Sequence, residues 1–399
     1  MSPALPAERP GPLKIALLGL LQILSWGGSF YLLGVLADPI VASTGWPRQG
    51  VLAGASVGLL VAGLLAPLCG RLIARVGGAT VLAWHGVFLT GGLWLMAVAP
   101  SLPVFLLAWV IIGIGMAGGL YDALFTALGA THGLGAKPII VGITLVSGFC
   151  TTVIWPLLAL LVHTLGWRWT CGLFGTLLLG IYPAYRFALY APPVAAAARH
   201  SEARQGEALP GSIYWAMTLV FALSAALMTC ISIVLLTVLQ ARGHSLASAI
   251  GLAALIGPAQ VLCRIADLLF KRQAPMTTAL LSCGLAAAGL LVVDFAPAWV
   301  AWGLVCYGTG NGLRAIVKGT LPLLVVSPAA YAEVSGRMSR PALIAQALAP
   351  VACGYLIAHL GSEAMIDLMA AMALLAFALC LWLARLVKVY KRGPAPIHP

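Results

Sequence analysis

The sequence predicts an all-α membrane protein with twelve transmembrane helices in two pseudo-symmetric six-helix halves. Of the 399 residues, 62% are hydrophobic and only 8% are charged, whereas about a quarter of a typical soluble chain is charged. Long apolar runs recur along the chain, and one segment occurs twice. Because the runs are continuous and do not alternate in polarity, they predict helices and not the strands of a barrel.

Each apolar run is about 20 to 28 residues long, which lets a helix cross a hydrocarbon core of about 30 Å with some tilt. In the eighth run, Pro258 removes a helical hydrogen bond and predicts a kink. The runs cover residues 13–37, 51–73, 79–99, 102–129, 138–163 and 169–190 in the first half, and 213–239, 245–269, 276–296, 298–325, 338–360 and 363–386 in the second.

The duplicated segment is an Ala-Trp pair followed, after five residues, by three small residues at alternate positions and a leucine. It begins at Ala108 and again at Ala301, an offset of 193 residues, and the same offset aligns Arg71 with Arg264. The sequence therefore predicts one half at 1–190, a linker at 191–212 and a second half at 213–399. Two such halves around a midplane site suit transport by alternating access.

The basic residues are distributed unequally between the two sides of the predicted bundle. Seventeen of the 22 Lys and Arg residues fall on one side or its border, three on the other, and Arg314 and Lys318 lie inside a span. The positive-inside rule places the excess, both termini and the linker in the cytoplasm. The net charge of +12 thus reflects topology in a lipid bilayer, and we expect a multi-pass protein of the inner (plasma) membrane, a monomer without a nucleic-acid partner.

Signatures of catalysis are not found in the sequence. The nine cysteines and seven histidines show no metal-ligand spacing, and neither a phosphate-binding glycine loop nor a nucleophile elbow occurs. We therefore expect neither an enzyme nor a bound cofactor or metal.

Two segments resemble the major facilitator superfamily. Residues 70–78 are similar to its cytoplasmic loop after span two, with Ala74 in place of the usual acidic residue, and 166–168 resembles a common turn. The resemblance covers essentially the whole chain and implies secondary transport by rocking halves. It also implies that this loop braces a cytoplasmic gate; the offset puts Asp267 at the acidic place in the second half. The implied gate residues are Arg71, Arg75, Arg264 and Asp267.

A finer resemblance concerns the first span and the loop after it. Residues 29–31, 34–36, 39–40 and 45–48 resemble the monocarboxylate and oxalate-formate branch of the superfamily. This resemblance gives Arg264 a second interpretation, as an arginine of span eight that binds a substrate carboxylate.

Arg314 is the charged residue nearest to the middle of a predicted span, where a charge is costly unless it meets a cavity or a partner. Lys318 follows one turn later on the same face, and the offset equates the two with Tyr121 and Phe125. One cationic and one aromatic face suit an anion with an apolar body. The alternative is a fixed ion pair between Arg314 and Asp122.

In the resembling family, spans one, four, seven and ten line the central cavity, which implies further candidates there. Gln22, Ser25 and Ser29 share one face of the first span. The expected substrate-binding residues are Arg314, Lys318, Tyr121, Phe125, Gln22, Ser29 and Asn311, and the expected coupling residue is Asp122.

We expect a secondary transporter that moves a small organic anion, coupled to protons. One alternative is an efflux transporter for apolar or toxic compounds, in which Arg314 is structural. Another is a membrane receptor or scaffold that transports nothing.

The topology is directly testable. Cytoplasmic reporter enzymes fused at Gly206 and after Pro399 should both be active, because the charge asymmetry places both sites in the cytoplasm. Opposite signals from the two fusions would refute the twelve-span arrangement.

Overall fold

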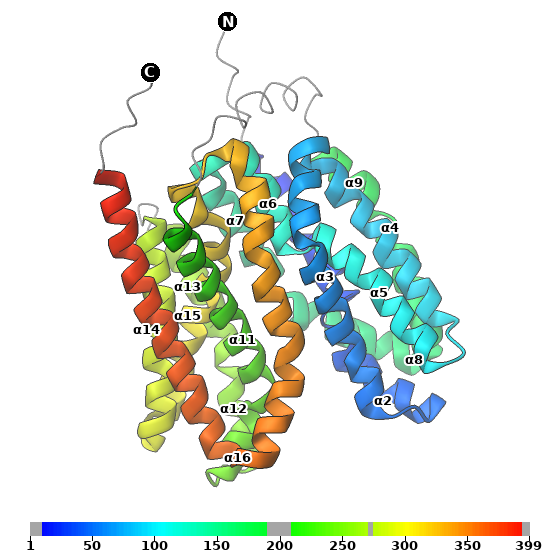
Figure 1. Cartoon of the computed structure of the whole chain (residues 1–399). Helices are drawn as coiled ribbons and strands as arrows, with labels where there is room; N and C mark the ends of the chain where they lie inside the picture. The colour runs from blue at the N-terminus through cyan, green and yellow to red at the C-terminus, as the bar shows by residue number, and fades with distance from the viewer. Residues whose placement is uncertain (1–9, 190–208, 270–273, 393–399) are drawn as a thin grey trace, which may run out of the picture. The chain divides into compact units, whose positions relative to one another are not determined.

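A computed structural model describes residues 10–189, 209–269 and 274–392, and throughout these residues the regular structure is helical (Figure 1). The chain divides into two compact units. Unit 1 comprises Met1–Gly206 and Ser327–Leu348, and unit 2 comprises Glu207–Val326 and Ala349–Pro399. Most of the predicted linker, residues 191–208, lies outside the described residues. The domain boundaries expected from the sequence stay a prediction.

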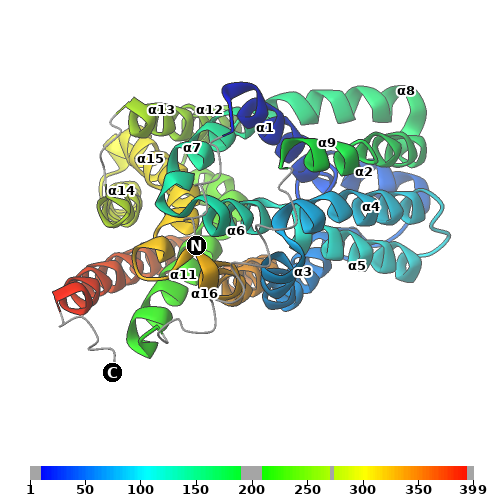
Figure 2. The ribbon, with the colours of Figure 1, turned by 90° about the horizontal axis from the view of Figure 1, so that it is seen from above.

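Unit 1 is built from the helices up to α9 and from the start of α16. Within it, α4 packs along α5, and α3 packs on α5 (Figure 2). Its helices are α1 (Pro12–Gly27), α2 (Leu33–Thr44), α3 (Arg48–Val76), α4 (Gly78–Ala97), α5 (Leu102–Gly119), α6 (Tyr121–His132), η1 (Gly133–Gly135), α7 (Ala136–Ser147), α8 (Cys150–Leu178) and α9 (Ile181–Ala188).

Unit 2 contains the remaining helices. The α14 and α15 helices pack along each other, and α13 also packs on α15 (Figure 2). The helices are α11 (Gly211–Ala241), α12 (Leu246–Ala254), α13 (Ile256–Leu269), α14 (Pro275–Phe295), η2 (Pro297–Trp299), α15 (Val300–Thr320), η3 (Pro322–Leu324) and α16 (Pro328–Arg392), which enters unit 2 at Ala349. At Gly361 the backbone of α16 turns, with a φ of 82° that glycine readily adopts.

Seven helical stretches of the described residues are long and apolar enough to cross a membrane. Two of them, Leu102–Ala188 and Pro328–Lys391, are each long enough for more than one crossing. The α15 helix, which carries Arg314 and Lys318, is not among them.

Several predicted spans are interrupted in the structure. The span at 102–129 breaks at Leu120, whose backbone is extended (ψ of −178°) between α5 and α6. The span at 245–269 breaks at Leu255, one residue after α12 ends at Ala254. The cause lies in Pro258, because a proline ring clashes with the carbonyl of the fourth residue before it, here Ala254. The kink expected from Pro258 therefore falls about one turn before the proline.

Glycines let α15 approach its neighbours closely. A Cβ atom at Gly310 would lie 2.5 Å from the carbonyl oxygen of Ser282 on α14, and one at Gly308 would lie 2.9 Å from that of Ile256 on α13. The hydroxyl of Ser282 donates to the Gly310 carbonyl over 2.7 Å. Close backbone contact of this kind is typical of small residues in membrane helices.

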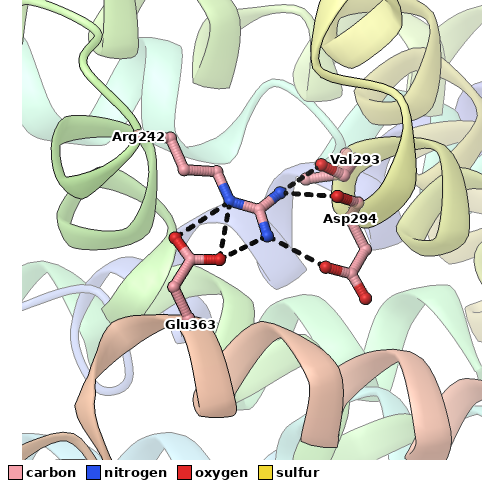
Figure 3. A network of polar contacts seen from close by, with 4 residues as sticks. All are labelled: Arg242, Val293, Asp294 and Glu363. Carbon is pink, nitrogen blue, oxygen red and sulfur yellow. Dashed lines mark hydrogen bonds and ion pairs between the residues drawn. The ribbon is translucent and has the colours of Figure 1, made fainter.

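An arginine at the end of α11 ties three helices of unit 2 together (Figure 3). Arg242 Nη2 lies 2.9 Å from Asp294 Oδ1 at the end of α14 and 2.7 Å from Glu363 Oε2 on α16. Its Nη1 donates to the backbone carbonyls of Val293 and Asp294, where a cation also meets the negative end of the α14 dipole. Hydrogen bonding to Glu363 raises the pKa of Arg242, so the brace stays charged.

Loss of this brace should destabilise unit 2. The side chains of Arg242 and Asp294 are only 12% and 5% exposed, so loss of this pair should cost more than the roughly 1 kcal/mol of an exposed pair. The Arg242→Gln variant in detergent should therefore unfold at a clearly lower temperature than the wild type. The matched control is Arg48→Gln, which removes an exposed pair with Asp38 and should cost less than about 1 kcal/mol. Equal losses in the two variants would contradict the assignment.

Candidate functional site

A pocket in unit 2 is lined by Arg314, the charged residue nearest to the middle of a predicted span. Arg314 projects from the glycine-rich part of α15, and the other walls come from α11, α14 and the second part of α16. The lining residues are Ser224, Leu227, Ser282, Cys283, Ala286, Tyr307, Gly310, Asn311, Arg314, Ala373 and Ala376.

Two neutral acceptors hold the guanidinium of Arg314. Its Nε donates to Asn311 Oδ1, one turn earlier on α15, over 3.0 Å. Its Nη2 is directed at the thioether sulfur of Met228 on α11. The site thus combines a fixed cation with hydroxyl and amide groups in a mainly apolar wall, a composition typical of small-ligand sites.

Arg314 and Asn311 both line this pocket, and residues that the sequence interpretation did not select lie beside them. Lys318 lies one turn beyond Arg314 on α15 and is not among the residues that line the pocket. Ser224, Leu227 and Met228 come from α11, where their spacing of three and four residues places them on one helix face. That spacing is visible in the sequence, but nothing in it indicates which partner the face meets.

Unit 1 carries a cluster of aromatic rings around Tyr121. The rings of Tyr121 and Phe125 are stacked, with centroids 5.0 Å apart and planes 12° apart, and Trp26 lies 5.1 Å from Tyr121. The hydroxyls of Tyr121 and Ser147 are 2.6 Å apart. Ring contacts extend the cluster through Phe30 and Tyr31 to Trp155. The rings of Trp26, Phe30, Tyr31 and Tyr121 are half-buried, so part of this aromatic surface is accessible.

The side chain of Gln22 stabilises the interruption between α5 and α6. Its Nε2 donates to the Gly119 carbonyl over 2.7 Å and to the Tyr185 hydroxyl over 2.9 Å. Its Oε1 accepts a bond from Trp26 Nε1. Gln22 thereby satisfies a carbonyl at the end of α5 and fixes one ring of the aromatic cluster.

Ser29 and Gln22 are both fully buried. The hydroxyl of Ser29 donates to the Ser25 carbonyl over 2.6 Å. The expectation that Ser29 and Gln22 bind substrate stays a prediction.

His85 is a buried polar residue that the sequence interpretation did not select. Its Nε2 lies 3.0 Å from the Ser25 hydroxyl, and its Nδ1 meets the Leu82 carbonyl. The ring lies against Gly119, where a Cβ atom would come within 2.0 Å of it. A histidine inside an apolar run could have indicated a buried polar contact, but two of its neighbours, Ser25 and Gly119, lie on other helices.

Asp122 lies in the first turn of α6, where the helix dipole favours a carboxylate. Its Oδ1 accepts a hydrogen bond from Ser339 of α16 over 2.6 Å. One turn later, Thr126 donates to Ser335 over 3.0 Å. The first part of α16 is thus joined to α6 by two side-chain hydrogen bonds within unit 1.

The four expected gate residues occupy two different environments. Arg71 and Arg75 are exposed near the end of α3. Arg264 and Asp267 are buried on α13, where Arg264 Nε donates to the Gly312 carbonyl over 3.2 Å. A gate function for these residues stays a prediction.

The fold and its apolar helices define a multi-pass membrane transporter. A model of the Major Facilitator Superfamily matches residues 18–339, and the chain belongs to this superfamily. Its fold is therefore that of twelve transmembrane helices in two halves, and the chain is a transporter and not an enzyme. No curated protein matches the sequence.

Two solved structures show the same fold at low sequence identity. The human organic anion transporter MFSD10 (TETRAN) is 19% identical, with a TM-score of 0.70 over 93% of this chain and 100% of that chain. The proton:xylose symporter XylE, bound to 6-bromo-6-deoxy-D-glucose, is 14% identical, with a TM-score of 0.69 over 94% of this chain and 96% of that chain.

The contact of His85 with Gly119 can be tested with two neighbouring glycines. Gly119→Ala should destabilise the protein strongly, because its Cβ atom would overlap the buried imidazole ring at 2.0 Å. Gly118→Ala is the matched control, since its Cβ atom would lie 3.5 Å from the nearest atom. Thermal unfolding in detergent should separate the two variants; an equal effect would show that the ring does not occupy this place.

Proposed function

We propose that the protein is a secondary transporter that moves a small organic anion across the membrane by alternating access, coupled to protons. The observation that carries this proposal is the placement of Arg314 in the pocket of unit 2. The pocket also contains the Asn311 amide and the Ser224 hydroxyl, which can donate hydrogen bonds to a bound oxyanion.

The energetics of a membrane interior favour an anion over a neutral substrate. An arginine inside a span is costly and marks substrate or ion pathways. Two contacts of Arg314 go to neutral groups, the Asn311 amide and the Met228 thioether. A carboxylate forms stronger, charge-assisted bonds with guanidinium, which makes it a well-suited ligand.

The aromatic cluster of unit 1 supports a substrate with an apolar body. Half-buried rings such as Trp26 and Tyr121 bind apolar groups through their large surface. One fold neighbour is named as an organic anion transporter, but at 19% identity the likeness concerns the fold. The pocket of unit 2 supports the anionic class of substrate, and the finer assignment to the monocarboxylate and oxalate-formate branch rests on residues 29–48 alone.

Further roles belong to the same proposal. Asp122 is the proposed proton-coupling residue, because it is a carboxylate on the broken fourth span. Arg71, Arg75, Arg264 and Asp267 are proposed to brace a cytoplasmic gate. The protein is also proposed to be a monomer of the inner (plasma) membrane. Its charge distribution supports the placement of both termini in the cytoplasm.

A second candidate function is efflux of apolar or toxic compounds. The aromatic cluster favours it, because stacked rings bind apolar ligands without help from a charge. In that case Arg314 serves the packing of unit 2, and its replacement leaves ligand affinity unchanged.

Replacement of Arg314 distinguishes the two candidates. Arg314→Ala should lower the affinity for a transported carboxylate by at least about tenfold, since a hydrogen bond to a charged group contributes roughly 1.5 to 3 kcal/mol. Arg314→Lys should lose less, because it keeps the charge but not the forked geometry. Binding of a carboxylate panel to the purified variants provides the measurement.

A double replacement tests the alternative ion pair of Arg314 with Asp122. If the arginine only neutralised this carboxylate, Arg314→Ala combined with Asp122→Ala would restore the uptake that each single change abolishes. The anion proposal predicts that the double variant stays inactive, and near-normal uptake by it would refute the substrate role of Arg314.

A further inference from the structure

The contact between Arg314 and Met228 joins a strong donor to a weak acceptor. A guanidinium carries five N–H donors, whereas a thioether sulfur is a weak acceptor. Yet Nη2 of Arg314 is directed at Met228 Sδ. A carboxylate oxygen that enters the pocket would be the better acceptor for this donor.

The side chain of Met228 can move away from Arg314 at low cost. Methionine is unbranched and has three rotatable side-chain bonds, so it adapts to a changed neighbour at low cost. The residue is half-buried on α11, and its backbone is part of a regular helix. The Nε group of Arg314, in contrast, is held by Asn311 on the same helix. One side of the guanidinium is thus fixed by Asn311, and the other donates to a side chain that can move.

We propose that Met228 is a positioning residue that competes with the anionic substrate for the Nη2 donor of Arg314. This inference rests on the proposed function, because it assumes that Arg314 binds the anion. Met228 orients the guanidinium and is displaced when the substrate carboxylate accepts the bond. When the anion leaves, the Met228 thioether again accepts from Nη2 of Arg314. The thioether therefore permits release of the anion as well as binding.

The proposal predicts a graded effect of acceptor strength at position 228. Met228→Leu has a similar volume but no acceptor, so the anion meets no competition and its affinity should rise by about threefold. Met228→Gln introduces an amide oxygen, a stronger acceptor than the thioether, and the affinity should fall by about tenfold. The expected order of affinity is Leu, Met, Gln.

The experiment measures binding of lactate and benzoate to the full-length protein and its variants by ligand-induced shifts of thermal unfolding. Met217→Leu is the matched control, because Met217 lies buried on the same helix, about three turns before Met228; it should not change the affinity. The unfolding temperature without ligand shows whether each variant is folded. If Met228→Gln does not fold, the comparison of Met228→Leu with the wild type still tests the proposal.

The variants at position 228 are also measured in combination with Arg314→Gln. In that background the differences in affinity among them should disappear. A graded order that needs Arg314 supports the inference. Equal affinities at position 228, with wild-type binding that still depends on Arg314, would overturn the role of Met228 and leave the proposed function standing. Wild-type binding that is independent of Arg314 would overturn both.

Discussion

The constraint on which the rest of the structure depends is the absence of water in the hydrocarbon core, which leaves every polar group to be satisfied by the protein itself. Where the fourth span breaks at Leu120, the carbonyl of Gly119 is bonded by Gln22. The same side chain accepts a bond from Trp26, so the compensation of a broken helix also orders the aromatic cluster. Irregular backbone at this depth is tolerated because unit 1 supplies the partners.

Two arginines of unit 2 meet this constraint in different ways. Arg242 meets two carboxylates, Asp294 and Glu363, and two backbone carbonyls at the ends of helices. It is a brace with its charge balanced. Arg314 donates instead to an amide oxygen and a thioether, inside a pocket where glycines of α15 bring the helices close. The contacts of Arg314 suit an anion that binds and leaves again, whereas the contacts of Arg242 do not.

The sequence predicts the helical membrane fold well because composition and run length decide it, and it selects Arg314 because a charge so deep in a span needs a partner. The break at Leu255 follows from Pro258. The break at Leu120 has no proline nearby and could not be predicted, since it depends on the distant Gln22. Met228 and His85 were missed for the same reason: their significance comes from contacts with residues 60 or more positions away, which periodicity along one chain does not reveal.

The most direct test of anion transport is uptake of radiolabelled lactate and benzoate into liposomes that contain the purified protein. A proton-coupled anion transporter should show saturable uptake that an inwardly directed proton gradient accelerates, with each carboxylate competing against the other. Liposomes without protein provide the background. Uptake no faster than this background for either carboxylate, by protein shown to be folded, would contradict the central claim.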